Sequence, residues 1–330
     1  MTEPRFEIPP AVLDGDSADV YFRRTDKILK ARGLNPVVTM EIFPRDDGIL
    51  CGVKEVCQLL NQASFEGELW ALEEGDPFAA KQTAMRIIAP YQSFGLYETA
   101  ILGILASSSG WATAARRCVE AAAGIPVISF GARHIHPKVA DVMDYAAIVG
   151  GCATGSTTGG SALHGLAPSG TMPHALILIM GDTVEAARAF DEIIERDVTR
   201  IVLIDTFRDE VEESIRVAEA LGEHLWGVRV DTPGERGGVT PDLIVELRQK
   251  LDLAGHKHVR IFVSSGLDPD KIRRFRERRT PIDGFGVGSY ISGARPIDFT
   301  GDLREIEGRP IAKRGRLPGR QENPALKRLM

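Results

Sequence analysis

Short apolar runs alternate with turn residues and amphipathic segments along most of the chain after Ile125. Runs suitable for strands occur at 126–130, 149–153, 166–169, 200–205, 226–231, 259–264 and 283–287. Most of the intervening segments have the period of an amphipathic helix. Strands that are apolar throughout and alternate with helices predict a parallel sheet covered by helices. Seven such units favour a closed or nearly closed α/β barrel over a doubly wound sheet, and the pattern is compatible with either.

The first third of the chain has a different texture. A helix is predicted from Ala18 to Arg32, strand-like runs follow at 37–43 and 86–89, and helices are predicted at about 54–62 and 98–122. After Tyr290 the chain is rich in Arg, Pro and Gly. We therefore expect an irregular, incomplete α/β barrel preceded by a small α+β sandwich domain. The expected boundaries are 1–124 for an N-terminal arm and the sandwich domain, 125–290 for the barrel, and 291–330 for a C-terminal segment that packs back on the N-terminal domain.

Composition narrows the class of protein. The 330 residues include 40 Lys and Arg against 46 Asp and Glu, a net charge of −6 that argues against a protein built around non-specific nucleic-acid binding. No apolar run reaches the ~20 residues that a membrane span requires. The first ten residues lack the basic and then apolar order of a signal peptide. The four cysteines show no CxxC pair and no zinc-ligand spacing. We expect a cytoplasmic protein with neither nucleic acid nor membrane as partner.

Charged side chains follow several predicted strands, where the loops of an α/β barrel meet at one mouth. Asp205 and Asp231 each end an apolar run, and two convergent carboxylates suit a hydrated Mg²⁺ and sugar hydroxyls. Their alternative role is to cap the following helices. Arg133 and Arg229 suit a phosphate or carboxylate, or else ion pairs with those aspartates. No lysine follows a strand, which counts against a Schiff-base aldolase.

The last two predicted strands end in small residues. Glycine allows close backbone approach, and exposed N–H groups at a helix start can surround a phosphate. We expect this phosphate site to use Ser265, Gly266, Gly286 and Gly288. The alternative is that these glycines serve only tight turns.

Two further side chains are candidates for contact with a substrate. Phe130 ends a strand beside Arg133 and can offer an aromatic face, or can simply be a core residue. His174 begins a predicted helix after Gly-Thr-Met-Pro, where an ordinary buried histidine is the default interpretation. His134 and His136 have the alternate spacing of a metal chelate, but no third ligand follows at suitable spacing.

Taken together, the motifs resemble those of the nicotinate phosphoribosyltransferases, in particular the shorter, archaeal-type members. The resemblance covers roughly residues 18–318. Its motifs, in order, are Asp19-Val-Tyr-Phe-Arg-Arg-Thr25, Tyr97-Glu-Thr-Ala, Phe130-Gly-Ala-Arg133, Gly170-Thr-Met-Pro-His174, Leu203-Ile-Asp-Thr-Phe207, Gly227-Val-Arg-Val-Asp-Thr232, Ser265-Gly266 and Gly284-Phe-Gly-Val-Gly288.

The resemblance implies transfer of phosphoribosyl from phosphoribosyl pyrophosphate to nicotinate in NAD biosynthesis, with Mg²⁺ as cofactor and ATP as a possible co-substrate. It implies a homodimer or higher homo-oligomer with shared active sites, in which Phe130 and the partner's Tyr21 sandwich the pyridine ring. His174 falls on the histidine that the family phosphorylates. The remaining implied site residues are Thr171 and Arg133 toward the substrates, Asp205, Arg229 and Asp231 toward ribose, pyrophosphate and Mg²⁺, and Ser265, Gly266, Gly286 and Gly288 toward the 5′-phosphate.

Hydroxyl side chains favour a pyridine that carries a carboxylate as the acceptor of the phosphoribosyl group. Ser156, Thr157 and Thr158 suit the carboxylate of nicotinate better than an acidic residue would, which favours nicotinate over nicotinamide. Quinolinate phosphoribosyltransferase, whose product loses CO₂, ranks second because a dicarboxylate requires more basic residues than Arg133, Arg229 and either Arg24 or His134. A barrel that binds phosphate without turnover is the alternative from another class.

Overall fold

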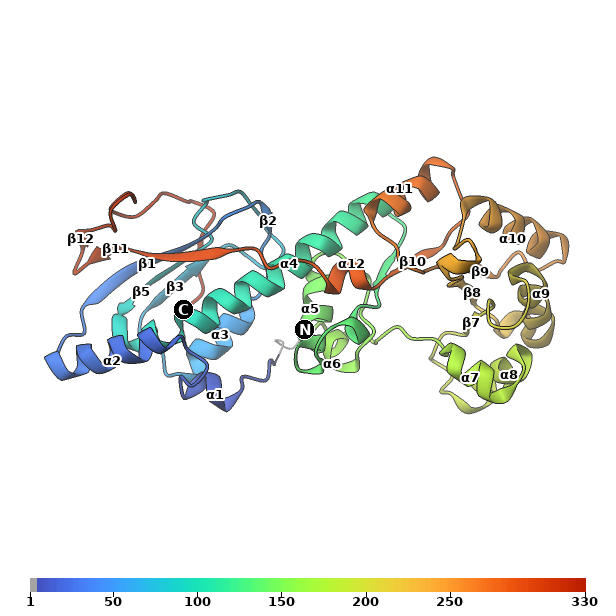
Figure 1. Ribbon diagram of the computed structural model, residues 1–330, viewed down its shortest axis with the longest axis horizontal. Helices are drawn as coiled ribbons and strands as arrows, with labels where there is room; N and C mark the ends of the chain where they lie inside the picture. Colours follow the sequence, from blue (N-terminus) through green and yellow to red (C-terminus); the bar gives the residue numbers. More distant parts are fainter. Residues whose placement is uncertain (1–4) are drawn as a thin grey trace.

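The computed structural model describes residues 5–330. It contains two large sheets, and the long helix α4 (Glu98–Ala122) packs against elements on both sides, among them β11 and α11 (Figure 1). The predicted N-terminal arm begins at residue 1, and its first four residues lie outside the described residues. None of the helices in the described part is long and apolar enough to cross a membrane.

The first sheet is antiparallel throughout and has six strands in the order β12-β11-β1-β5-β3-β13. Its strands are β1 (Val37–Pro44), β3 (Glu68–Ala71), β5 (Met85–Pro90), β11 (Phe299–Ile306), β12 (Arg309–Pro310) and β13 (Lys327–Arg328). A separate pair joins β2 (Gly48–Ile49) to β4 (Pro77–Phe78). The helices of this unit that precede α4 are α1 (Pro10–Leu13), α2 (Val20–Arg32) and α3 (Val53–Gln62), with short 3₁₀ turns at Tyr91–Ser93 and Gly95–Tyr97.

No strand was predicted where β11 lies. Small, polar and charged residues separate the few apolar ones in this segment, and most of its positions are only partly buried. Such a segment shows no apolar run, so local pattern does not mark it. It nevertheless pairs with β1 from Pro44 back to Val38, with one irregularity near Thr39. The sequence predicted no strand for these residues, and the pairing with β1 places them against the first sheet.

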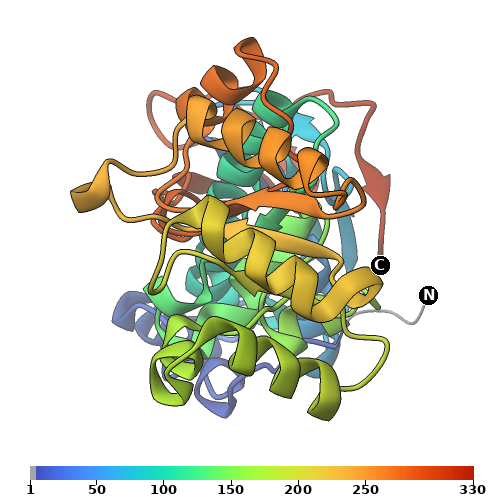
Figure 2. The same cartoon turned by 90° about the vertical axis from the view of Figure 1, so that its right-hand side faces the viewer.

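The second sheet is parallel and open, with five strands in the order β6-β10-β9-β8-β7. The strands are β6 (Val127–Ser129), β7 (Ile201–Leu203), β8 (Gly227–Val230), β9 (Arg260–Val263) and β10 (Gly284–Val287). The accompanying helices are α5 (Ala140–Val149), α6 (Thr158–Ala162), α7 (His174–Met180), α8 (Thr183–Ile193), α9 (Glu210–Leu221), α10 (Pro241–Leu253), α11 (Pro269–Glu277) and α12 (Ser289–Ser292), and 3₁₀ turns lie at Ala132–His134, Pro137–Val139, Gly222–His224 and Gly234–Arg236. Figure 2 shows α7 to α11, coloured green through orange, one above another in front of the strands.

The mixed α/β class, with a small sheet unit before an incomplete α/β barrel, is confirmed. Two of the seven predicted strands are wrong. Val149 ends α5, and Gly151 then adopts a left-handed φ of 111°, so the apolar run at 149–153 turns instead of extending. Only Thr154 pairs, by a single parallel bridge to Ile128. The segment 166–169 is loop, and it contains a proline that has no N–H for a ladder.

A buried acid ties the antiparallel sheet together. The side chain of Glu41 on β1 is fully buried. Its carboxylate accepts two hydrogen bonds from Arg86 on β5, the shorter 2.7 Å, and lies 3.2 Å from Nε of Arg304 on β11. The N–H of Gln321 donates to it at 3.0 Å, so the C-terminal segment is held as well. Breaking a buried pair leaves an uncompensated charge, which is costly.

We expect Arg86→Met to lower the free energy of unfolding by about 3–5 kcal/mol, because Glu41 would lose its main partner in a dry site. The matched control is Arg328→Met, which breaks the exposed ion pair with Glu68 and should cost less than about 1 kcal/mol. Urea unfolding followed by circular dichroism measures both. Equal losses in the two variants would contradict a central role for Glu41.

Candidate active site

A cavity of about 440 Å³ opens where the strands β6, β8, β9 and β10 end. Its walls combine hydroxyls, glycines, two arginines, a histidine, a carboxylate and one aromatic ring. The lining residues are Phe130, Ala132, Arg133, His134, Ser156, Ser169, Gly170, Thr171, Met172, Pro173, Arg229, Asp231, Ser264, Ser265, Gly266, Gly286, Gly288 and Ser289. Because the carboxyl ends of parallel strands share one edge of a sheet, residues far apart in sequence meet here.

Most of the site residues predicted from sequence line this cavity. They are Phe130, Arg133, Ser156, Thr171, Arg229, Asp231, Ser265, Gly266, Gly286 and Gly288. Asp205 and His174 are not among the lining residues, but both lie next to Asp231, which is. Thr157 and Tyr21 are not among the lining residues.

Asp205, Asp231 and His174 form a compact group at the ends of β7 and β8. The N–H of Asp231 donates to Oδ2 of Asp205 at 2.8 Å, so the two carboxylates are held side by side. Nε2 of His174 lies 3.9 Å from Oδ1 of Asp205 and 3.8 Å from Oδ2 of Asp231. These separations exceed hydrogen-bond length, so the histidine faces both acids as an electrostatic partner.

Two neighbouring hydroxyls fix this group, and sequence reasoning assigned a role to neither. Thr206 Oγ1 lies 2.9 Å from Nδ1 of His174, and Ser264 Oγ donates to Oδ1 of Asp231 at 2.7 Å. Ser264 immediately follows β9 and Thr206 lies three residues after the end of β7, and this position near a strand end was the available signal. They leave Nε2 of His174 and Oδ2 of Asp231 facing each other.

The environment shifts the pKa values of all three groups. The nearby carboxylate of Asp231, together with that of Asp205, raises the pKa of His174 despite partial burial. Burial raises the pKa of Asp205, whose Oδ1 accepts no hydrogen bond. Burial also opposes ionisation of Asp231, yet His174, Ser264 and Arg229 outweigh it and lower the pKa of that carboxyl. The group therefore favours a protonated histidine beside an ionised Asp231.

Arg229 brings a nearly dry cation to the cavity. Its side chain is 16% exposed, its guanidinium carbon lies 5.3 Å from the centre of the Phe130 ring, and its Nη2 lies 3.8 Å from Asp231. Its Nε is buried without a hydrogen-bond partner in the described structure. Burial lowers the pKa of Arg229, against the pull of the two aspartates. Unused donors on a desolvated guanidinium favour an anionic ligand at this wall.

The loop after β9 has unusual backbone geometry. Ser265 and Gly266 adopt φ values of 80° and 60°, both in the left-handed region that non-glycine residues rarely enter. The Ser265 hydroxyl donates to the carbonyl of Thr232 at 3.0 Å, which helps hold this conformation. Backbone strain of this kind gathers at ligand sites. The loop fits the predicted phosphate contact through Ser265 and Gly266.

Gly286 is required for a further reason besides the expected approach of a phosphate. A Cβ at this position would lie 2.5 Å from Cε2 of Phe130, so the aromatic ring lies directly against the strand backbone. A Cβ at Gly288 would lie 3.2 Å from the carbonyl oxygen of Phe130 and 3.3 Å from His134. Both glycines thus make room for the Phe130 segment while they line the cavity.

The structure places some hydroxyls differently from the sequence expectation. Thr157 caps α6 by accepting from the N–H of Gly160 at 3.1 Å, and Thr158 is the first residue of that helix. Ser156 lines the cavity, but its hydroxyl proton points to Asp144 at 3.3 Å. The contact of Ser156 with a substrate carboxylate stays a prediction.

Tyr21 lies on α2, at the left of Figure 1, whereas the parallel strands lie at the right. Its side chain is exposed, and its hydroxyl donates to Asp19 at 3.2 Å within the same unit. This chain's own Tyr21 does not reach the cavity.

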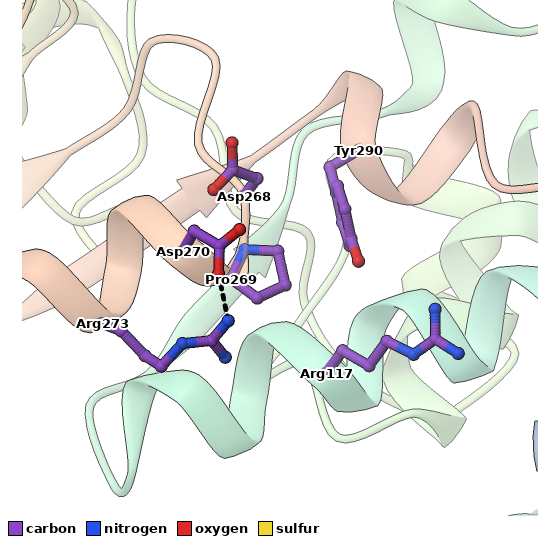
Figure 3. A pocket seen from close by; sticks show the side chains of 6 residues that line it. All are labelled: Arg117, Asp268, Pro269, Asp270, Arg273 and Tyr290. Atoms are coloured by element: carbon purple, nitrogen blue, oxygen red, sulfur yellow. Dashed lines mark hydrogen bonds and ion pairs between the residues drawn. The ribbon is translucent and has the colours of Figure 1, made fainter.

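A second hollow of about 340 Å³ lies between α4 and the starts of α11 and α12 (Figure 3). Its lining residues are Arg117, Asp268, Pro269, Asp270, Arg273 and Tyr290. Arg273 pairs with Asp270 on the same helix. None of the predicted site residues lies in this hollow, so the larger cavity is the candidate active site.

Comparison with known proteins assigns a family to this arrangement. Residues 19–109 match the model of the quinolinate phosphoribosyl transferase N-terminal domain, and residues 111–302 match that of the C-terminal domain. The chain belongs to the quinolinate phosphoribosyl transferase family. The matched ranges meet inside α4.

Similar proteins include two nicotinate-nucleotide pyrophosphorylases and a nicotinate phosphoribosyltransferase. A solved structure of nicotinate-nucleotide pyrophosphorylase from Pyrococcus furiosus is 43% identical, with a TM-score of 0.86, over 97% of this chain and 82% of that one. A "probable nicotinate-nucleotide pyrophosphorylase" of Methanothermobacter thermautotrophicus is 22% identical over 88% of this chain and 96% of its own length. A nicotinate phosphoribosyltransferase of Mycobacterium tuberculosis is 31% identical over 83% of this chain, which spans only 61% of that relative.

The expectation of an ATP-coupled nicotinate phosphoribosyltransferase is therefore wrong. The quinolinate family models cover both halves of the chain, and the similar structure of a nicotinate-nucleotide pyrophosphorylase covers nearly all of it. The family match gives no support for a phosphorylated histidine. The geometry gives a physical reason against one, because Nε2 of His174 faces two carboxylates that would repel a phosphoryl group.

We expect His174 to titrate above the ordinary histidine pKa of about 6.5, so that the ring keeps its proton to higher pH than a free histidine. Asp231→Asn should lower this pKa by removing the nearer acid. Histidine NMR signals followed against pH measure the shift. Asp252→Asn, which removes an acid paired with Arg248 on α10, is the control and should leave His174 unchanged. Titration of His174 at or below the ordinary value would disprove the electrostatic account.

Proposed function

We propose that this protein is a quinolinate phosphoribosyltransferase. It transfers phosphoribosyl from phosphoribosyl pyrophosphate to quinolinate and yields nicotinate mononucleotide, pyrophosphate and CO₂. One observation carries the proposal. In this member of the family, a wall of basic and aromatic side chains and the left-handed loop after β9 line the same cavity. The 43% identity to the Pyrococcus nicotinate-nucleotide pyrophosphorylase supports it. The chain spans only 61% of the length of the Mycobacterium tuberculosis relative, so the activity of the whole protein is part of this proposal.

Quinolinate carries two carboxylates and therefore needs several cations. The scarcity of basic residues made this substrate the second choice from sequence. In the folded chain, Arg133, His134 and Arg229 all line the cavity, and Arg229 lies against the Phe130 ring. A flat dianion fits a wall of two guanidiniums and one aromatic face, because guanidinium binds carboxylates in a planar, bidentate geometry.

The reaction requires no covalent bond between the substrates and a protein side chain. The bond from ribose C1 to pyrophosphate breaks, and the pyridine nitrogen forms a new bond to that carbon. The carboxylate next to the nitrogen leaves as CO₂, and a proton takes its place on the ring. Positive charge builds on the sugar and negative charge on the leaving group. Asp231 suits the first and Arg229 the second, since preorganised charges stabilise charge that develops in the transition state.

A magnesium ion fits the acidic side of the cavity. No group of three or more His, Cys, Asp or Glu that could hold a metal occurs among residues 5–330. Mg²⁺, however, usually uses one or two carboxylates together with water and substrate phosphates. Asp231 lines the cavity, and Oδ1 of Asp205 is buried behind it without a hydrogen bond. These two acids would hold the ion, which would supply positive charge to the departing pyrophosphate.

The loop after β9 is proposed to hold the 5′-phosphate. Ser265 and Gly266 present backbone N–H groups in a left-handed turn, and Ser289 starts the short helix α12 beside Gly288 at the same cavity. Concave runs of backbone N–H groups bind anions. The sugar phosphate and the aromatic acid would then lie at opposite walls of one cavity.

A homodimer is proposed as the working unit. The helix α2 exposes Val20, Tyr21 and Ile28, and α7 exposes Leu178 and Ile179, the last at 84%. Large exposed apolar side chains that gather on one helix mark interaction surfaces. Contact of α2 with a second copy would bring Tyr21 toward the partner's cavity, which is the role implied by the sequence resemblance.

Purified protein with Mg²⁺ and phosphoribosyl pyrophosphate should release pyrophosphate and CO₂ in equal amounts when quinolinate is supplied. Arg133→Met should lower kcat/KM for quinolinate about 100-fold, close to the 3 kcal/mol that a charge-assisted contact provides. Arg328→Met, on the far sheet, is the control. Turnover with nicotinate but not quinolinate, or no pyrophosphate release at all, would refute the proposal.

The oligomer proposal has its own test. Ile179→Asp should shift the protein from dimer toward monomer in sedimentation velocity, because a charge would be buried at the interface. Leu253→Asp, also at an 84% exposed position but on α10, is the matched control and should leave the dimer intact. An unchanged sedimentation coefficient for Ile179→Asp would place any interface elsewhere.

A further inference from the structure

A buried carboxylate lies behind the cavity wall. Asp144, in the middle of α5, is 0% exposed. Four donors converge on it. Its Oδ1 accepts from the Ser129 hydroxyl at 2.7 Å, and its Oδ2 accepts from the N–H groups of Ser156 and Thr157 at 2.9 and 2.8 Å and from the Ser156 hydroxyl at 3.3 Å.

The four donors around Asp144 require a side chain that only accepts hydrogen bonds. No ion pair neutralises Asp144 in the described part of the chain, so hydrogen bonds alone offset the cost of burying its charge. A carboxylate offers about four lone-pair sites and no donor. An asparagine at the same place would direct an NH₂ group at donors and leave at least one of them unsatisfied.

Glycines permit this close approach. A Cβ on Gly155 would lie 2.7 Å from Cγ of Asp144, and one on Gly160 would lie 2.6 Å from its Cβ. Both distances are shorter than real Cβ contacts, so the loop 155–160 reaches Asp144 only because these positions lack side chains. The loop and the acid therefore form one fitted unit.

The contacts of Asp144 extend into three parts of the cavity wall. Ser129 precedes Phe130, whose ring faces Arg229. Ser156 lines the cavity itself. The carbonyl of Gly155 accepts from the N–H of Ser169, which starts the stretch of wall that runs to Pro173. None of these contacts reaches the loop after β9 that is proposed to hold the phosphate.

We propose that Asp144 is a positioning residue that sets the wall against which the aromatic acid binds, and that it leaves the phosphate-binding loop after β9 unaffected. This inference rests on the proposed function for its choice of substrate. It assigns a role to a residue in the interior of a helix that touches no reacting atom. Asp144 holds the backbone N–H groups of Ser156 and Thr157, and so fixes the position of the loop that lines this wall.

The test separates the two substrates. Asp144→Asn should raise KM for quinolinate about tenfold, equivalent to about 1.4 kcal/mol, as expected for a lost hydrogen bond to a charged group. KM for phosphoribosyl pyrophosphate should stay within about twofold. Ser129→Ala, which removes one of the four donors, should raise KM for quinolinate by a smaller factor in the same direction. A purely structural role would move the thermal midpoint without this split between the two KM values.

Glu213→Gln is the matched control. Glu213 is also fully buried, but it lies on α9, where it pairs with Arg216. Its variant should lose thermal stability while both KM values stay unchanged. If Asp144→Asn raised both KM values equally, or changed only the thermal midpoint, the positioning role would be overturned.

A second readout does not depend on turnover. Hydrogen exchange at the N–H groups of Ser156 and Thr157 should speed up at least tenfold in Asp144→Asn, because both N–H groups lose a charged acceptor. Exchange at Ile261, whose N–H donates to Asp283, should not change. If the wild-type protein turned over no quinolinate, the proposed function would fail while this experiment still judged Asp144. Unchanged exchange at both amides would reject the role of Asp144 whatever the substrate.

Discussion

The candidate active site depends on mutual compensation among charges that would be unstable alone. Asp205 is 1% exposed and Arg229 is 16% exposed, at the ends of adjacent strands. A single buried ion is costly, whereas neighbouring opposite charges offset part of that cost for each other. His174 and Asp231 complete the balance, and Thr206 and Ser264 hold them in place. The result is a group of fixed charges beside an open cavity, where a charged substrate meets little reorganisation.

The parallel sheet explains why this group exists at all. Pairing of β7 with β8 and of β8 with β9 brings their carboxyl ends to one edge. The strand order then places β10 and β6 on the other side, with Phe130 lying on Gly286. One wall therefore carries acid and base, another carries small residues and left-handed backbone, and the ring of Phe130 lies between them. Phosphoribosyl transfer needs this combination of anion contacts and a flat surface.

The sequence predicted those site residues that lie at the ends of apolar strand-like runs. Asp205, Arg229 and Asp231 follow apolar runs, and their convergence follows from the parallel arrangement. It did not predict Asp144, since an acid inside an amphipathic helix normally faces solvent and its four donors come from distant segments. It also missed β11, whose pairing with β1 spans most of the chain and leaves no local periodicity. The preference for nicotinate was wrong because it assumed that a dicarboxylate requires more basic residues than Arg133, Arg229 and His134. The family match favours quinolinate in a cavity lined by these three residues.

The most direct test of the central claim is a structure of the protein with phosphoribosyl pyrophosphate, Mg²⁺ and phthalate, a dicarboxylate of quinolinate's shape without the nucleophilic nitrogen. We expect the aromatic ring to lie against Phe130 with its carboxylates toward Arg133 and Arg229, and the 5′-phosphate to lie at Ser265 and Gly266. Binding of either ligand in the hollow beside Tyr290, or a phosphate at Arg133 with the ring elsewhere, would contradict it.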